Sequence, residues 1–572
     1  MFGQATEAQY IANTWDNYNS QRQSKIALWK ELRNYVFATD TSTTTNSTLP
    51  WKNSTTLPKL CQIRDNLHSN YISALFPNDE WLKWEGYSQS DAVKEKRDSI
   101  EAYMSNKTRT GHFRTEMSKL LYDYIDYGNA FATVDFESSY VLDPQDNRTI
   151  KFIGPRARRI SPLDIVFNPL ANDFVSSFKI IRSIKTVGQL KKMAEEQPEN
   201  TYLKDAIGRR LDMMSKMNAY GIDEASKAEG VSIDGFGNYF EYLQSGYVEL
   251  LEFYGDLHNQ NTGEVQANRI ITVIDRMWTI RNEAIPSWLG HAPIYHVGWR
   301  SRPDNLWAMG PLENLVGMQY RIDHLENLKA DAMDLAVLPP LVIKGEVEQF
   351  TYGPSAEIHI DEAGEVTELA RNVQWVITAE NNIDKIEMRM EQYAGAPREA
   401  MGIRSAGEKT AFEVQQLQNA AGRIFQEKIT TFEIEMVEQL LNAMLEVSKR
   451  NMDTADWARV MDDDLGVQQF MEITKEDITA SGVLRPIGAR HFAAQAQLVQ
   501  NLTNLSNTPI WQQIAPHVSA KQLAKMVEDV LGFGRFQLIR PNVAVVEQQE
   551  TQRMMNQATE DLEVEQTVQG PQ

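Results

Sequence analysis

Charged side chains are spread unevenly along the chain, and their clusters are the first groups that could do chemistry. Residues 336–375 hold seven carboxylates and two basic residues, a net charge of −5. Residues 311–335 hold five carboxylates and two basic residues, a net charge of −3. Carboxylates at this density repel a polyanion, but they can also be solvated surface groups or pair with basic groups of a neighbouring molecule. Both interpretations stay open at this point.

A basic segment follows at residues 395–409. It contains Arg398, Arg404 and Lys409 beside two glutamates. A few cations on a loop can touch phosphate groups transiently, whereas a continuous basic surface would hold them. Gly402 and Gly407 favour movement of such a loop. The alternative is that these are ordinary solvated loop charges.

The sequence has none of the spacings typical of a metal centre or a nucleotide-hydrolysing site. Its nine histidines form no His-Glu-x-x-His pair, and Asp462-Asp463-Asp464 lacks the companion ligands of a calcium loop. Cys61 is the single cysteine, so one chain cannot form a disulfide or a cysteine-based zinc site. No Gly-x-x-x-x-Gly-Lys-Ser/Thr loop occurs. We therefore expect no enzymatic activity, no metal and no cofactor; an unfamiliar hydrolase is the enzymatic alternative.

Length and composition predict a globular protein with several cores. The chain has 572 residues, of which 42% are apolar and 24% charged, with a formal net charge of −21. A protein that wraps DNA by neutralising phosphates is normally basic, so this composition argues against ordinary nucleic-acid binding. The first residues lack the pattern of a secretory signal, and no run of 18 apolar residues occurs. We expect a protein of the reducing cytoplasm.

The first half of the chain must supply a mixed scaffold for these groups. Apolar periodicity predicts helices at residues 7–37, 57–76 and 91–127. Short β-like runs follow up to residue 186, with an irregular connection at 160–169. A hairpin is predicted for the two runs 247–258 and 268–282, with a turn supplied by Gly263, and a strand for 293–299.

The second half is predicted to be mainly helical. A helix at 311–335 and another at 378–394 flank short β-like pieces at 341–372. The capping box Thr410-Ala411-Phe412-Glu413 opens a long helix that continues to about residue 448. Two helices at about 487–506 and 519–532 and a Gln/Glu-rich tail complete the chain. The fold class expected is α+β, mainly helical.

This order of elements resembles the portal proteins of tailed bacteriophages, and most closely the head–tail connectors of short-tailed phages. The resemblance extends over about residues 130–450. The stretches that carry it are Thr262-Gly263-Glu264, Pro293-Ile294-Tyr295, residues 304–311, residues 319–327, AVLPPLVI at 336–343 and the run Thr410-Ala411-Phe412-Glu413-Val414. The last is similar to the family's Thr-Ala-x-Glu-Val signature, although Gln418 stands where the family often has arginine, so that arginine's role is not transferred.

The resemblance implies a portal fold with wing, stem, clip and crown. The corresponding ranges are an N-terminal helical and β-rich wing at 1–305, a first stem helix at 306–336, a clip at 337–376, a second stem helix at 377–395, a tunnel loop at 396–409, a long wing helix at 410–450, a C-terminal wing and crown region at 451–545 and a flexible tail at 546–572.

The function that the resemblance implies is that of a portal subunit in a ring of about twelve copies. Such a ring sits at one capsid vertex of the virion and serves as the channel for DNA packaging and ejection. Its expected partners are other copies of the chain, the terminase motor, a tail adaptor, the major capsid protein, scaffolding or core proteins, and duplex DNA that passes without specific binding; no membrane is involved. Assembly would take place in the host cytoplasm. The alternative is another virion component, such as a tail adaptor or an internal core protein.

The same resemblance gives the charged residues their expected places. Arg398, Arg404 and Lys409 would belong to the DNA-facing tunnel loop. The acidic clip and channel residues would be Glu346, Glu348, Asp361, Glu362 and Glu365, and those of the stem Asp323, Glu326, Asp331 and Asp384. A further basic cluster, Arg156, Arg158 and Arg159, is expected to pair with carboxylates of a neighbouring subunit rather than with DNA.

Overall fold

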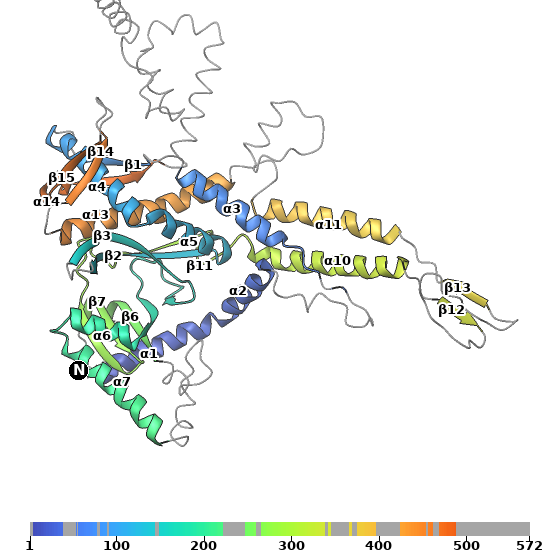
Figure 1. Cartoon of the computed structure of the whole chain (residues 1–572), viewed down its shortest axis with the longest axis horizontal. Helices are drawn as coiled ribbons and strands as arrows, with labels where there is room; N and C mark the ends of the chain where they lie inside the picture. Colours follow the sequence, from blue (N-terminus) through green and yellow to red (C-terminus); the bar gives the residue numbers. More distant parts are fainter. Residues whose placement is uncertain are drawn as a thin grey trace, which may run out of the picture. The chain divides into compact units, whose positions relative to one another are not determined.

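The computed structural model describes most of the chain between residues 4 and 487. The described residues are 4–37, 53, 55–76, 81–87, 91–142, 148–220, 246–258, 265–337, 341–344, 365–368, 374–395, 424–452, 456–461 and 468–487. The chain divides into two units, residues 1–74 with 82–486 and residues 75–81 with 487–572. Helices and strands are mixed in the first unit (Figure 1). In the second, Phe76 packs edge-on against Trp81.

A five-stranded antiparallel sheet lies between helices of the first unit. Its strands, in the order β4-β5-β6-β7-β8, are β4 (Ile165–Phe167), β5 (Lys179–Thr186), β6 (Tyr247–His258), β7 (Val265–Ile274) and β8 (Trp278–Ala284). Side chains alternate along a strand, so Leu251 and Phe253 of β6 face α1 (Gln4–Gln21), whereas Val248 and Leu250 face the other side. That side is covered by α6 (Val187–Glu196) and α7 (Thr201–Tyr220).

The turn between β7 and β8 was not expected, because the sequence offers no glycine there. Asp275 and Arg276 both have positive φ values, 49° and 60°, in a tight hairpin turn. Arg276 Nε donates to the Glu249 carboxylate at 2.7 Å, and its Nη1 donates to Asp16 at 2.8 Å. These ion pairs stabilise a backbone conformation that the local sequence disfavours. The turn divides the predicted strand 268–282 into β7 and β8. The turn expected at Gly263 lies outside the described residues.

A three-stranded antiparallel sheet, in the order β3-β2-β9, forms the second layer. It consists of β2 (Asn129–Leu142), β3 (Arg148–Ile160) and β9 (Ile294–Gly298), as expected for strands in these regions. Phe131 of β2 packs with Phe167, Phe174 and Trp307 in an aromatic core. Residues 160–169, expected to be irregular, contain the short strand β4, which pairs with β5.

Two of the predicted long helices are broken. The first becomes α1 and α2 (Gln23–Val36), and the second becomes α4 (Asp91–Thr110) and α5 (Phe113–Asp126). At the first break Arg22 donates to the carbonyls of Pro162 and Ile165, each at 2.7 Å. At the second, His112 adopts a left-handed backbone, φ 57°. After the first break the neighbours change: α1 packs on β4, β6 and β8, whereas α2 packs on α5, α10 and η1.

The remaining described elements complete the body of the first unit. They are α3 (Lys59–Leu75), β1 (Leu82–Gly86), β10 (Arg300–Arg302), β11 (Asn305–Met309), η1 (Glu313–Leu315), α13 (Gln439–Asn451), β14 (Asp456–Met461), β15 (Gln468–Ile473), α14 (Lys475–Ile478) and β16 (Gly482–Pro486). The strand pairs are β1 with β16, β10 with β11 and β14 with β15, all antiparallel.

The predicted long helix is described from residue 424 onward. Residues 424–432 are helical, a π-helical stretch, η2, follows at Glu433–Glu438, and α13 continues to Asn451. The capping box at 410–413, the loop 396–409 and the helices expected beyond residue 487 lie outside the described residues.

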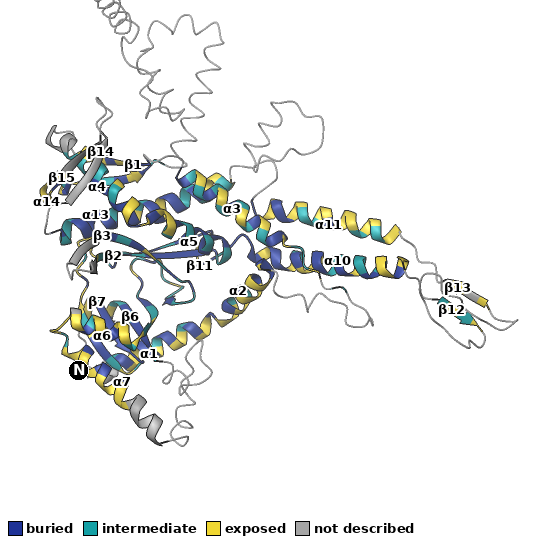
Figure 2. Ribbon diagram, viewed as in Figure 1, coloured by how far each residue is buried: buried dark blue, intermediate teal, exposed yellow. Residues whose placement is uncertain are grey.

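Two helices, α10 (Val316–Val337) and α11 (Gln374–Tyr393), pack along each other (Figure 1). Between them in the sequence, β12 (Leu341–Lys344) pairs antiparallel with β13 (Glu365–Glu368). A helix, short β-like pieces and a second helix were the order expected here. Figure 2 shows that exposed residues continue along α11 and over part of α10.

Candidate functional site

The paired helices α10 and α11 form the candidate site, because all four predicted stem residues lie on them. Glu365 lies on β13, where it is exposed and accepts a hydrogen bond from Lys344 at 3.1 Å. The other predicted clip residues, Glu346, Glu348, Asp361 and Glu362, lie outside the described residues, as do the loop cations Arg398, Arg404 and Lys409.

A row of polar side chains on α10 accepts hydrogen bonds from the backbone of residues 53, 55 and 57, which precede α3, and of Leu60 in the first turn of α3. The row consists of four residues spaced by four: Gln319, Asp323, Asn327 and Asp331. Their side-chain oxygens accept from the backbone N–H groups of Leu60 at 3.2 Å, Leu57 at 3.0 Å, Thr55 at 2.7 Å and Asn53 at 3.0 Å, respectively. We call this arrangement the acceptor row.

The acceptor row can form because the spacing of its side chains along the helix matches the spacing of every second amide along an extended chain. Four residues of an α-helix advance about 6 Å along its axis. Two residues of an extended chain advance about 6.6 Å, so every second amide of the segment 53–57 meets the next helical acceptor. The polar side chains of α10 thus accept the backbone hydrogen bonds that a neighbouring strand would otherwise accept. Gln319 also donates from its amide to the carbonyl of Leu57 at 2.5 Å.

Two of the predicted stem carboxylates, Asp323 and Asp331, belong to the acceptor row. Asp323 is 0% exposed and Asp331 is 2% exposed, and both are engaged with the segment 53–57. They therefore add no solvated charge to a channel wall in this chain, contrary to the expectation of an acidic belt along residues 311–335. Glu326 instead pairs with Lys329 at 2.6 Å, and Asp384 is exposed on α11.

Two lysines fix α11 to its surroundings through its carboxylates. Lys329 of α10 also contacts Glu380 of α11 at 2.6 Å, which links the two helices. Buried Lys59, in the first turn of α3, contacts Glu391 at 2.6 Å and Glu387 at 3.3 Å. Several of the acidic groups of α10 and α11 are thus used in holding the helices in place.

Large apolar side chains remain exposed on the same two helices. Trp375 is 73% exposed and Ile377 61% on α11, and Val337 is 77% exposed on α10. Further exposed apolar residues of the pair are Tyr320, Leu328, Met333, Met388 and Tyr393. Helical periodicity predicted both helices but not which of their apolar side chains stay exposed, because nothing in the sequence says which apolar face a partner helix covers.

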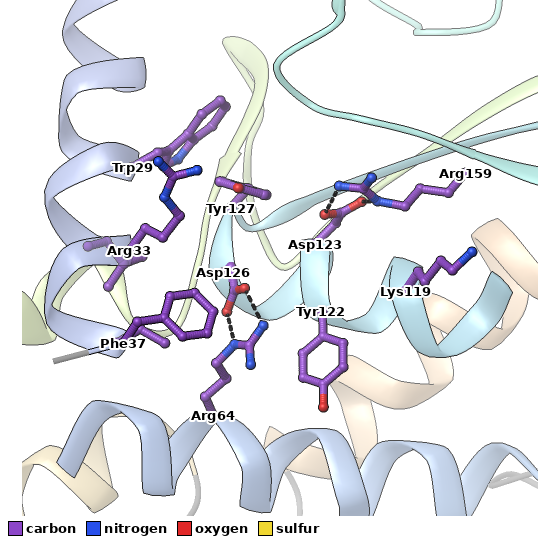
Figure 3. Close-up of a pocket in the computed structure, with 12 residues that line it drawn as sticks. Trp29, Arg33, Phe37, Arg64, Lys119, Tyr122, Asp123, Asp126, Tyr127 and Arg159 are labelled. Atoms are coloured by element: carbon purple, nitrogen blue, oxygen red, sulfur yellow. Dashed lines mark hydrogen bonds and ion pairs between the residues drawn. The ribbon is translucent and has the colours of Figure 1, made fainter. Parts of the chain in front are cut away.

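A cavity of about 270 Å³ lies between α2, α3, α5 and β3 (Figure 3). Four of its six charged lining residues form two ion pairs, each with a carboxylate of α5. Arg64 donates twice to Asp126, at 2.6 and 2.8 Å, and Arg159 forms two hydrogen bonds with Asp123. The Arg64 guanidinium also lies 4.0 Å from the centre of the Tyr122 ring. The two ion pairs join α3 and β3 to α5, so we interpret this cavity as a structural junction.

Burial raises the pKa of Asp123 to about 7, although Arg159 acts in the opposite direction. The folded chain then binds more protons than the unfolded chain between about pH 4 and pH 7, so this group's contribution to stability is lost as the pH rises. Asp123→Asn should remove that dependence. We expect the wild type to lose up to about 1.4 kcal/mol per pH unit relative to this variant. Urea denaturation at several pH values, followed by tryptophan fluorescence, measures the difference.

The control for this prediction is Asp98→Asn, which changes an exposed carboxylate of α4. Its stability curve should run parallel to that of the wild type between pH 4 and pH 7. Parallel curves for Asp123→Asn as well would mean that Arg159 keeps the Asp123 carboxyl ionised throughout this range.

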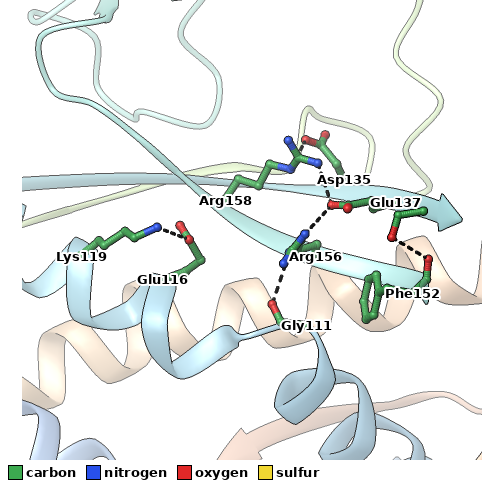
Figure 4. Close-up of polar contacts among 9 residues, drawn as sticks. Gly111, Glu116, Lys119, Asp135, Glu137, Phe152, Arg156 and Arg158 are labelled. Carbon is green, nitrogen blue, oxygen red and sulfur yellow. Dashed lines mark hydrogen bonds and ion pairs between the residues drawn. The ribbon is translucent and has the colours of Figure 1, made fainter. Parts of the chain in front are cut away.

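The basic cluster of β3, which was expected to pair with a neighbouring subunit, has carboxylate partners within the chain itself (Figure 4). Arg156 and Arg158 both donate to Glu137 of β2, at 2.8 and 2.9 Å. Arg159 is held by Asp123, as described above. The reason is the register of β2 against β3, which places carboxylates of one strand beside arginines of the other.

The histidines near β9 occupy ordinary positions. His296 stacks on Phe131 and contacts the Asn129 side chain at 3.0 Å, and burial lowers its pKa to about 3. In the part of the chain that the structure describes, no group of three or more His, Cys, Asp or Glu residues is placed to hold a metal ion. Over the same residues, no helix has the length and apolar character needed to cross a bilayer.

Comparison with known proteins adds no relative. No protein-family model matches the chain, and no curated protein matches it. The resemblance in the order of elements and short sequence stretches therefore remains a prediction.

Proposed function

We propose that this chain is a portal subunit: one copy of a ring that serves as the channel for DNA packaging and ejection and as the docking site for a packaging motor and a tail adaptor. The observation that supports the proposal best is the paired helices α10 and α11 with the small β12–β13 hairpin between them in the sequence. This is the order that a stem and clip require.

The exposed apolar residues of the pair supply the reason for self-association. Trp375, Ile377 and Val337 lie on two packed helices and still present most of their surface to solvent. Apolar surface of this kind is stabilised by burial, at about 25 cal/mol per Å². In a ring, each copy meets its neighbour through two different faces, and the contacts close when the rotation between copies is right. Another copy of the helical pair is the partner that this proposal assigns to these residues.

The charge of the chain fits passage of DNA better than its retention. With a net charge of −21 per copy, a ring repels a polyanion unless basic groups are gathered at one place. Arg156, Arg158 and Arg159 of β3 are already paired with Glu137, Asp135 and Asp123 within the chain. In this proposal DNA passes without specific binding, and the chain does not act as an enzyme. The clip would meet the motor and adaptor, and the exposed pair Lys344–Glu365 belongs to that region.

Negative-stain electron microscopy of the purified full-length chain tests the proposal. We expect closed rings of about twelve copies, with a central opening wide enough for duplex DNA. Mass photometry of the same sample gives the number of copies independently.

A homogeneous monomer at high concentration would contradict the proposal. In that case the alternative of a tail adaptor or an internal core protein becomes the better explanation, because such proteins assemble on a ring formed by another chain. A ring with a strongly basic opening would also contradict it, since such an opening would hold DNA rather than let it pass.

A further inference from the structure

A second cavity, of about 340 Å³, lies where the break between α1 and α2 meets β4 and the β10–β11 hairpin. It belongs to neither the helical pair nor the ion-paired cavity of Figure 3. We call it the hairpin cavity. Its lining combines basic and polar side chains of α1, α2, β10 and β11 with apolar side chains of β4 and of the residues that follow it.

All charged residues that line the hairpin cavity are cations. They are Arg22, Lys25 and Arg302. This differs from the cavity of Figure 3, where Asp123 and Asp126 lie among the cations. In a chain of net charge −21, a cavity with only basic charges in its lining is a local reversal of sign. Like charges gathered around a cavity repel one another, and an anion between them relieves that repulsion.

Lys25 has capacity for a further acceptor. Its ammonium donates to the carbonyl of Ala308 at 2.6 Å and lies 5.8 and 6.0 Å from the ring centres of Trp29 and Trp307. An ammonium has three donors. Burial lowers the pKa of Lys25; the nearby Glu313 carboxylate opposes this, and Arg302 lowers the pKa further. Glu313 does not line the cavity and accepts from Trp29 Nε1 at 3.2 Å.

Neutral hydrogen-bond donors complete the lining. Asn305 uses its side-chain oxygen to accept from the backbone N–H of Trp307 at 2.8 Å, so its amide N–H groups are the part that can serve a ligand. Ser24 and Gln21 add a hydroxyl and a second amide, and both are exposed. A ligand here meets donors from α1, α2, β10 and β11 at once. Donors from several directions suit an anion whose oxygens also point in several directions.

We propose that the hairpin cavity binds a phosphate group, with Lys25 and Arg302 as its charged contacts. A tetrahedral phosphate presents oxygens on all sides, whereas a carboxylate presents two in one plane. The volume leaves room for a group attached to the phosphate, which would lie against Tyr18 and the exposed side chain of Leu170. The phosphate belongs either to a free phosphorylated small molecule or to the DNA backbone. This inference does not depend on ring formation.

The test titrates the full-length chain with inorganic phosphate by isothermal calorimetry at constant ionic strength. The variant Arg302→Gln removes an exposed cation of β10, so it should leave the fold intact. We expect it to weaken phosphate binding by about tenfold or more, as the loss of a charged hydrogen bond does. The matched control is Arg300→Gln on the same strand, which changes an exposed arginine that lies over Trp299 and does not line the cavity. Its affinity should equal that of the wild type.

A second variant and two further ligands sharpen the result. Lys25→Met keeps the length of the side chain and should also weaken phosphate binding, with hydrogen exchange confirming that α2 is folded. Competition by a short DNA duplex assigns the phosphate to a nucleic-acid backbone, and competition by adenosine monophosphate alone assigns it to a free small molecule. The proposal is overturned if the wild type fails to bind phosphate, if Arg302→Gln binds as tightly as Arg300→Gln, or if a hexaglutamate peptide binds more tightly than either phosphate ligand.

Discussion

Asp323→Leu should release the segment 53–57 from α10 and lower the free energy of its local unfolding by about 3 kcal/mol. The Asp323 carboxylate accepts from the Leu57 backbone N–H at 3.0 Å and from the Gln319 amide at 2.9 Å, and it is fully buried. Leucine has the same branched arrangement of heavy atoms, with methyl groups in place of the two oxygens, and offers no acceptor, so two buried donors lose their partner. Each such orphan costs about 1–3 kcal/mol.

Hydrogen exchange of the peptide that contains residues 53–60 measures this loss. Its amides should exchange about a hundredfold faster in Asp323→Leu than in the wild type, because about 1.4 kcal/mol corresponds to a factor of ten. The matched control is Asp323→Asn, which keeps the accepting oxygen and removes the charge; its exchange should stay within a few-fold of the wild type. Equal acceleration in both variants would show that the charge, and not the acceptor, holds the segment.

The double variant Trp375→Glu/Ile377→Glu should prevent assembly while leaving the fold of the single chain unchanged. Both side chains are largely exposed, so their replacement disturbs few contacts within the chain. In a ring they would be buried at every interface, where losing a large apolar side chain costs about 1.5–3 kcal/mol and burying an unpaired carboxylate costs more. Because a closed ring repeats the defect at each contact, we expect monomers at micromolar concentration.

Mass photometry gives the distribution of species, and circular dichroism checks that the helical content is unchanged. The matched control replaces Tyr202 and Leu211 of α7 by glutamate, which adds the same charge to exposed apolar positions outside the helical pair. The control should assemble like the wild type. Rings formed equally by both double variants would place the subunit contacts away from α10 and α11.

Much of the element order could be predicted from local sequence. Alternating periodicity predicted strands in the regions of β2, β3 and β9, and helical periodicity predicted helices that overlap α10 and α11. These patterns depend on residues close together in the sequence, so they can be recognised without the tertiary structure. The breaks at Arg22 and His112 could not be predicted in this way, because the carbonyls that hold Arg22 come from residues about 140 positions away.

For the charged residues, too, the local sequence predicted their positions in the chain but not their contacts in the folded protein. Local sequence identified an acidic helix at 311–335, but it could not say that the segment 53–57 would cover Asp323 and Asp331. The spacing of Gln319, Asp323, Asn327 and Asp331 by four was a signal that these residues share one face. The function of this shared face could not be predicted, because the backbone groups that it binds lie more than 250 residues earlier in the chain. Likewise, Arg156 and Arg158 contact Glu137 because of the register between β2 and β3, which the local sequence does not give.

The sequence by itself determined the mixed helix-and-strand class, the two helices with short β-like pieces between them around residues 316–393, and the excess of negative charge. These depend on residue types and on periodicity, which are properties of neighbours along the chain. Only the tertiary structure decided which charges are exposed, which are neutralised, and which cations meet in the hairpin cavity. The physical reason is that an ion pair or a buried hydrogen bond acts over a few ångströms in space, and the chain brings distant residues within that range only when it is folded.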